Sequence, residues 1–143
     1  MDVTQAIYDK LSTDAALVAL LANYPSGSPQ SPAIFTSWPV PPDATRPYVF
    51  SRGDVSVASF DELTGPLGRS TIRDVTVIAD NTGSDADVET IANRIRAVLH
   101  RQALTFPVGT HVMTQCIDGP TVAETDDSLT GRRLTFRIVA MEA

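Results

Sequence analysis

The sequence predicts an α+β fold: a single, mostly antiparallel sheet of about four strands, one long amphipathic helix packed on it, and an N-terminal helical segment. Apolar residues recur at helical spacing near the N-terminus and in residues 84–101, and at the two-residue spacing of strands in residues 48–52, 71–80 and 132–140. These segments follow in the order helix, strand, strand, helix, strand, strand, with no internal repeat. The length is usual for one domain, so we expect residues 1–143 to form a single domain.

The N-terminal segment carries two helix-capping signals. Asp2 stands three residues before Gln5, in capping-box register, and apolar residues follow at helical spacing. The run Ser12-Thr13-Asp14 offers a second cap. We therefore expect two short helices, or one helix kinked near Ser12.

A proline-rich stretch, residues 25–47, follows. It holds most of the chain's ten prolines, which prevent regular hydrogen bonding except in brief pieces such as Ile34 to Trp38. The apolar Ile34, Phe35 and Trp38 favour packing across the surface over a disordered linker. Pro47 is expected to mark the start of a strand, because proline suits the first residue of a strand.

Two strands are expected next, separated by a connection. Tyr48 and Phe50 point to one side of the first strand and Val49 to the other. Residues 54–70 lack sustained periodicity and contain two glycines and a proline, so we expect a long loop or a loose hairpin connection. Residues 71–80 carry apolar residues on both faces, which indicates a central strand.

The long helix is the clearest element. Ser84 is expected to cap it, with Asp87 at the capping-box position. Its apolar stripe should lie on the sheet and consists of Val88, Ile91, Ile95, Val98 and Leu99.

The remainder of the chain is expected to supply two strands. One lies near His111 to Ile117, and a turn region over residues 118–131 leads to the last strand. In that strand Leu134, Phe136 and Ile138 alternate with residues that include Arg133 and Arg137.

Composition argues against several functional classes. The net charge is −6 and Lys10 is the only lysine, which weighs against a nucleic-acid-binding module. Cys116 is the only cysteine, so neither an intrachain disulfide nor a cysteine-based zinc site is expected. The longest apolar run, Ala15 to Ala22, is too short to cross a bilayer, and no signal peptide is recognisable, so we expect a cytoplasmic origin.

No catalytic or metal-binding constellation is predicted. Strand alternation places His111, Met113 and Gln115 on one face and Cys116 on the other, so a His/Met/Cys copper site is not expected. We expect no cofactor and no enzymatic activity. The alternative, a small cytoplasmic enzyme, would require a concave pocket in which His100 or His111 meets a carboxylate.

The succession of segments resembles a known family. It comprises the helix pair "IYDKLSTDAALVALL", the proline-rich stretch, the strand entry "RPYVFSR", the strand "TIRDVTVIAD", the helix "SDADVETIANRIRAVL" and the closing strand "GRRLTFRIVA". This order resembles the tail terminator (tail completion) proteins of long-tailed phages and of phage-derived particles such as gene transfer agents. The resemblance spans nearly the whole chain and rests on element order and short patterns.

The resemblance implies a structural role. Such a protein forms a homo-oligomeric ring, expected to be a hexamer, on the head-proximal end of the tail tube, where it stops tube polymerisation and offers the surface to which the filled head joins. The implied partners are the tail tube protein and a head completion or connector protein. DNA would pass through without specific binding, and no membrane is involved. The protein would be cytoplasmic during assembly and then part of the virion or particle tail.

The resemblance also suggests where contacts lie. An acidic loop formed by Glu124, Asp126 and Asp127 is expected to face the lumen and to repel DNA. The candidate subunit or tube contacts are Asp61, Glu62, Arg69, Arg133 and Arg137. Another neck component of the same particle, such as a head completion or connector protein, remains an alternative, as does a monomeric adaptor.

Overall fold

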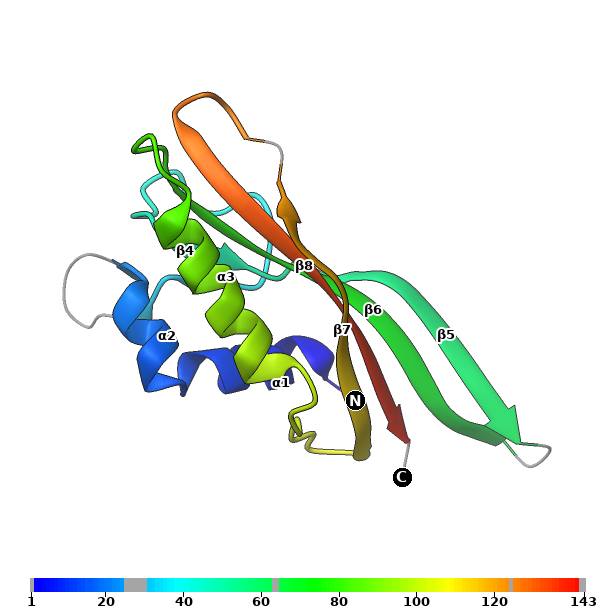
Figure 1. Ribbon diagram of the computed structural model, residues 1–143. Helices are drawn as coiled ribbons and strands as arrows, with labels where there is room; N and C mark the ends of the chain where they lie inside the picture. Colours follow the sequence, from blue (N-terminus) through cyan, green and yellow to red (C-terminus); the bar gives the residue numbers. More distant parts are fainter. Residues whose placement is uncertain (1, 25–30, 63–64, 124, 142–143) are drawn as a thin grey trace.

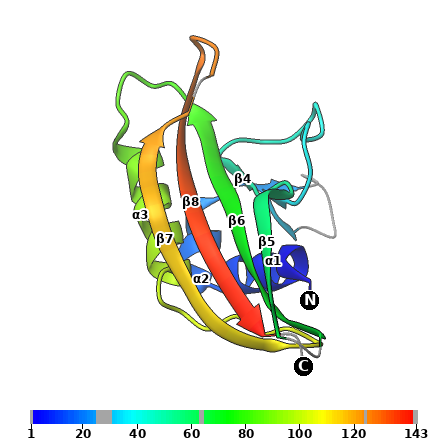
Figure 2. The same cartoon turned by 90° about the vertical axis from the view of Figure 1, so that its right-hand side faces the viewer.

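Three helices cover one face of a curved sheet in the computed structural model, which describes residues 2–24, 31–62, 65–123 and 125–141 (Figures 1 and 2). The helices are α1 (Val3–Ser12), α2 (Ala15–Leu20) and α3 (Ala86–Leu99). The strands are β1 (Asn23–Tyr24), β2 (Ser31–Pro32), β3 (Ile34–Phe35), β4 (Tyr48–Phe50), β5 (Asp54–Glu62), β6 (Gly65–Asp80), β7 (Thr110–Val122) and β8 (Leu129–Met141).

The main sheet has six strands, in the order β3-β4-β6-β8-β7, with β5 also paired to β6. Strands β4 and β5 lie end to end along one edge of the long central strand β6, and β8 lies along its other edge. Only the β3–β4 pair is parallel, and β1 and β2 form a separate antiparallel pair. The α+β class and the mostly antiparallel sheet are confirmed, whereas the expected number of about four strands is wrong.

The additional strands come largely from residues expected to form a loop. Residues 54–62 pair antiparallel with residues 65–73 in a long hairpin, which extends away from the helices (Figure 1). Strand alternation is visible in a sequence only where one face is buried. Here Val55, Val57 and the residues between them are exposed, so burial imposes no period on the sequence.

The helix caps agree only in part with the expectation. The carboxylates of Asp2 and Asp14 accept hydrogen bonds from the backbone N–H groups of Gln5 and Leu17, at 2.9 Å each, and two separate helices form. Helix α3 instead has Asp85 as its N-cap residue, and the Ser84 hydroxyl accepts a bond only from the N–H of Ala86, at 3.2 Å. The Asp85 carboxylate is directed to strand β8, which is why it does not cap the helix.

Apolar side chains are buried on both faces of the sheet. The larger cluster lies between the helices and the sheet and includes the fully buried Ile95, Phe136 and Ile138. The smaller cluster lies on the opposite face, where Tyr48 and Ile78 pack against residues of the proline-rich stretch. The alternation in residues 48–52, 71–80 and 132–140 therefore predicted the two faces correctly, and the expected packing of Ile34 and Phe35 is confirmed.

Strand β7 departs from regular alternation. Its register with β8 shifts between His111 and Met113, between Cys116 and Asp118, and again before Thr121. Because of the first shift, the His111 Nε2 atom lies 2.7 Å from the Thr114 hydroxyl, which strict alternation would place on the opposite face. The expected grouping of His111 with Met113 and Gln115 is therefore wrong. Much of the expected turn region, residues 118–131, is also strand, because β7 continues to Val122 and β8 begins at Leu129.

Within the described residues, no helix combines the length and the apolar character needed to cross a lipid bilayer.

Candidate functional site

The sheet face opposite the helices is hollowed into a groove of about 1170 Å³. Its floor is formed by β4, β6 and β8, and its walls by residues 36–38, residues 52–55 and the β7–β8 turn. The apolar lining includes Tyr48, Phe50 and Ile78, and the Trp38 ring lies over Phe50 with centroids 4.7 Å apart. Trp38 is 49% exposed, so the groove presents a large aromatic surface to solvent.

Charged groups also line the groove. The Asp74 carboxylate accepts a 2.6 Å hydrogen bond from the Thr135 hydroxyl, and Asp54 pairs with the buried Arg73 at 2.8 Å. Arg52 and Arg133 line the same groove, and neither has an ion-pair partner among the described residues. The groove therefore combines apolar and charged groups, as protein contact surfaces do.

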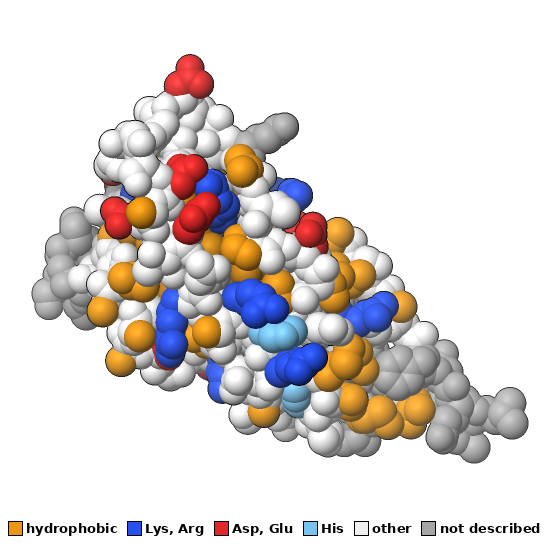
Figure 3. Space-filling view, in the orientation of Figure 1, with side chains coloured by type: hydrophobic (Ala, Val, Ile, Leu, Met, Phe, Trp, Pro, Cys, Tyr) orange, Lys and Arg blue, Asp and Glu red, His pale blue; other side chains and the backbone are white. Residues whose placement is uncertain are grey.

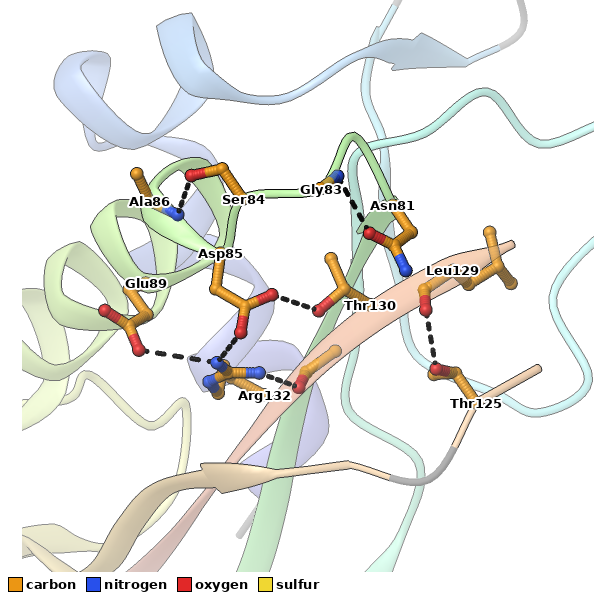
Figure 4. Close-up of polar contacts among 11 residues, drawn as sticks. Asn81, Gly83, Ser84, Asp85, Ala86, Glu89, Thr125, Leu129, Thr130 and Arg132 are labelled. Atoms are coloured by element: carbon orange, nitrogen blue, oxygen red, sulfur yellow. Dashed lines mark hydrogen bonds and ion pairs between the residues drawn. The ribbon is translucent and has the colours of Figure 1, made fainter. Parts of the chain in front are cut away.

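A buried arginine, Arg132, joins the start of α3 to β8 at the end of the molecule that carries the β7–β8 turn (Figure 4). The Arg132 guanidinium donates to Asp85 at 2.8 Å and to Glu89 at 3.3 Å, and also to the carbonyl of Gly131 at 2.9 Å. Thr130 donates a 3.0 Å hydrogen bond to the same Asp85 carboxylate. These bonds tie the start of α3 to β8, and Arg132 lowers the pKa of Asp85 below its ordinary value.

The predicted acidic loop lies at this same end, in the turn between β7 and β8. Asp126 lines the groove, and hydrogen bonds from the Ser128 hydroxyl and backbone N–H lower its carboxyl pKa. Asp127 is exposed, and its carbonyl accepts a 3.3 Å bond from Asn81. Glu124 lies outside the described residues. Acidic side chains are prominent toward this end of the molecule, with basic ones beside them, whereas the histidines and further basic side chains lie over its middle (Figure 3).

The predicted contact residues fall in two places. Arg133 and Arg137 are exposed on β8, on the sheet face away from the helices, opposite Thr76 and Ile72 of β6. Asp61 and Glu62 end β5, and their side chains lie outside the described part of the chain. Arg69 is exposed on the paired strand β6, opposite Ser59.

Two outer strands of the sheet, β5 and β7, carry exposed hydrophobic side chains that the sequence interpretation did not single out. Val55 and Val57 lie on β5, and Val112, Ile117 and Val122 lie on β7. Residues 54–70 were expected to form a long loop or a loose hairpin connection, and near His111 to Ile117 only the presence of a strand was predicted. The sequence shows β-branched residues at these positions. Whether such side chains are buried or exposed depends on the strand register, which the sequence alone does not give.

Neither histidine meets a carboxylate among the described residues. The His100 Nδ1 atom accepts a 2.9 Å hydrogen bond from the backbone N–H of Cys116, and His111 contacts Thr114. Burial lowers the pKa of both histidines, with smaller effects of Arg96 and Arg101 on His100. In the same described part of the chain, no cluster of three His, Cys, Asp or Glu side chains could hold a metal ion.

Comparison with protein families identifies the chain. A family model described as tail completion protein gp17 matches residues 5–140. The chain belongs to this tail completion family. It is accordingly a structural component of a phage-like tail and not an enzyme, and the enzyme alternative is excluded.

A solved structure has a similar fold. A chain in the structure titled "Virion of native gene transfer agent (GTA) particle" aligns with a TM-score of 0.76 and 23% sequence identity, covering 97% of this chain and 94% of that one. At this identity the likeness shows the fold. No curated protein sequence was found to match the chain.

Proposed function

We propose that this tail completion protein caps the head-proximal end of a tail tube as a ring. The ring, a hexamer by the family resemblance, stops tube polymerisation and provides the surface to which the filled head joins. Its partners would be the tail tube protein and a head completion or connector protein, in a phage or a gene transfer agent particle. Assembly would take place in the cytoplasm, before the protein becomes part of the particle tail.

One observation carries the proposal: apolar side chains are exposed along the outer strands β5 and β7, which lie on opposite sides of the sheet. Val57 is 52% exposed on β5 and Val122 is 73% exposed on β7. Exposed apolar groups on edge strands indicate surfaces that are covered in an assembly. Because the two edges differ, contact between them is head-to-tail, and head-to-tail contacts close into a ring when the rotation between copies permits.

Charged residues on the ring would have separate roles. We assign Glu124, Asp126 and Asp127 to the lumen, where carboxylates repel the DNA phosphates and prevent tight binding during transit. We assign the remaining candidate residues to contacts with neighbouring subunits or with the tube: Asp61, Glu62, Arg69, Arg133 and Arg137. Arg133 and Arg137 support this assignment, because they are exposed without an ion-pair partner in the described residues.

The role is tested by electron microscopy of particles from a strain that lacks the gene, with a plasmid-borne wild-type copy as the control. Overlong or ragged tails that are not joined to filled heads are expected. Tails of normal length would refute tail termination. If such tails were also unjoined to heads, the alternative of another neck component would be favoured, and affinity capture would then recover portal or connector proteins rather than tail tube protein.

A further inference from the structure

Three exposed hydrophobic side chains lie where an edge strand gains one extra residue. Val55 lies between Asp54 and Ser56 of β5, where the register with β6 shifts. Val112 and Ile117 lie at two corresponding shifts of β7 against β8. Their exposed fractions are 64%, 53% and 46%. A β-bulge re-aims the side chain of the extra residue, and here each bulge leaves an apolar group exposed at an edge of the sheet.

Edge strands of natural proteins usually carry lysine, proline or charged residues that prevent pairing with other chains. Residues 55–59 of β5 read Val-Ser-Val-Ala-Ser and contain none of these. On β7 the register shifts interrupt the backbone ladder, so an extended pairing with an arbitrary strand is disfavoured. The exposed side chains of both edges nevertheless remain available for a specific partner.

The two apolar edges lie on opposite sides of one sheet (Figure 2). A second copy of the chain can therefore bring its β7 edge to the β5 edge of the first while keeping its own β5 edge free for a third copy. Both edges bear uncharged β-branched side chains of similar size, which pack well against each other across neighbouring strands. A closed ring of such contacts buries the β5 edge and the β7 edge of every copy.

We propose that neighbouring subunits meet at these edges, with Val55 and Val57 of one copy packed against Val112 and Ile117 of the next. The contact is made chiefly by side chains, because the bulges of β5 against β6 and of β7 against β8 bend the two edge strands and so disfavour a continuous backbone ladder between copies. This inference rests on the proposed ring and names the surfaces that close it.

Two charge variants test the contact in particles. The first variant carries Val55→Lys and Val57→Lys, and the second carries Val112→Glu and Ile117→Glu. Each variant alone places charges against an apolar edge, so each should lower the yield of head-joined particles by roughly tenfold or more. Co-expressed in one cell, the two variants can alternate around an even-numbered ring, with Lys against Glu at one contact and the native edges at the next. Co-expression should restore most of the yield.

Leu20→Lys is the matched control, because Leu20 is exposed on α2 and lies on neither edge. It should leave the yield unchanged. A wild-type yield from either edge variant alone would overturn the proposal, as would a loss that co-expression does not repair, since the edges would then contact a different protein. These outcomes are separate from the test of the role itself, because the gene-deleted strain reports tail length without any edge variant.

Disulfide trapping gives a second measurement that does not depend on the folding of the charge variants. In a Cys116→Ser background, Val57→Cys with Val112→Cys should yield oxidation-dependent ladders of this chain in purified particles. Val57→Cys with Leu20→Cys is the control and should yield no ladder. Monomer alone from the Val57→Cys and Val112→Cys pair, or a cross-link to a protein of another mass, would refute the contact between copies.

Discussion

The packing of α3 on the sheet can be tested by a graded series at Ile95. This side chain is 0% exposed and lies in the cluster between the helices and the sheet. Ile95→Val removes one methylene and should lower the free energy of unfolding by about 1 kcal/mol. Ile95→Ala also leaves a cavity and should cost about 3 kcal/mol.

Ile95→Asp should unfold the protein at neutral pH. The substitution forfeits the same burial and in addition places a carboxylate in an apolar site, where desolvation costs several kcal/mol. The total is comparable with the roughly 5–15 kcal/mol by which natural domains are stable. The assay is urea denaturation followed by circular dichroism at pH 7, with the midpoint compared across the series.

Asn93→Asp is the matched control on the same helix. Asn93 is exposed, so the same new side chain should change the stability by less than about 0.5 kcal/mol. A folded Ile95→Asp variant with a wild-type urea midpoint would show that α3 does not bury this face, and the argument for the core would fail.

Three further variants test the acidic turn, an ion pair and a glycine. Asp126→Lys with Asp127→Lys should leave the unfolding midpoint nearly unchanged but impair DNA delivery, and normal delivery by such particles would contradict the lumen assignment. Arg94 lowers the pKa of Asp14 in the folded state, so the pair contributes stability above the ordinary carboxyl pKa that is lost as the pH falls through the lowered value. Asp14→Asn should therefore destabilise the protein at pH 7 and have little effect near pH 2, and an equal effect at both pH values would refute the linkage. Gly119→Ala should cost roughly 1–3 kcal/mol in urea denaturation, because φ is +93° and an added Cβ would meet the backbone of β8; wild-type stability would refute this conformation.

The elements that pack against a core were predictable from the sequence. Burial of one face imposes the helical spacing of α3 and the alternation of β8, and both were located by that spacing. The Asp2 and Asp14 caps were recognisable for a related reason, because each carboxylate bonds to a backbone N–H three residues later.

The features at the edges of the sheet were not predictable in the same way. For residues 54–70 the sequence indicated only a long loop or a loose hairpin connection, and the regular pairing of β5 with β6 was not predicted, because no buried face imposes alternation on β5. The bulges at Val112 and Ile117 depend on the register between β7 and β8, which the apolar pattern of β7 alone does not specify. Arg132 was likewise not singled out. It is 7% exposed and binds Asp85, whereas its neighbour Arg133 is exposed. Two adjacent arginines look alike in the sequence, so the sequence does not indicate which of them is buried.

The sixteen-residue strand β6 has a mechanical consequence. One covalent segment runs from the projecting hairpin into the helix-covered body, and β8 pairs with every residue from Gly68 to Asp80. A pull on the hairpin directed along the strand loads these ladder hydrogen bonds in shear and together, so that they share the tension instead of breaking one at a time. Force applied to the hairpin would thus pass into the body of the subunit before the ladder yields.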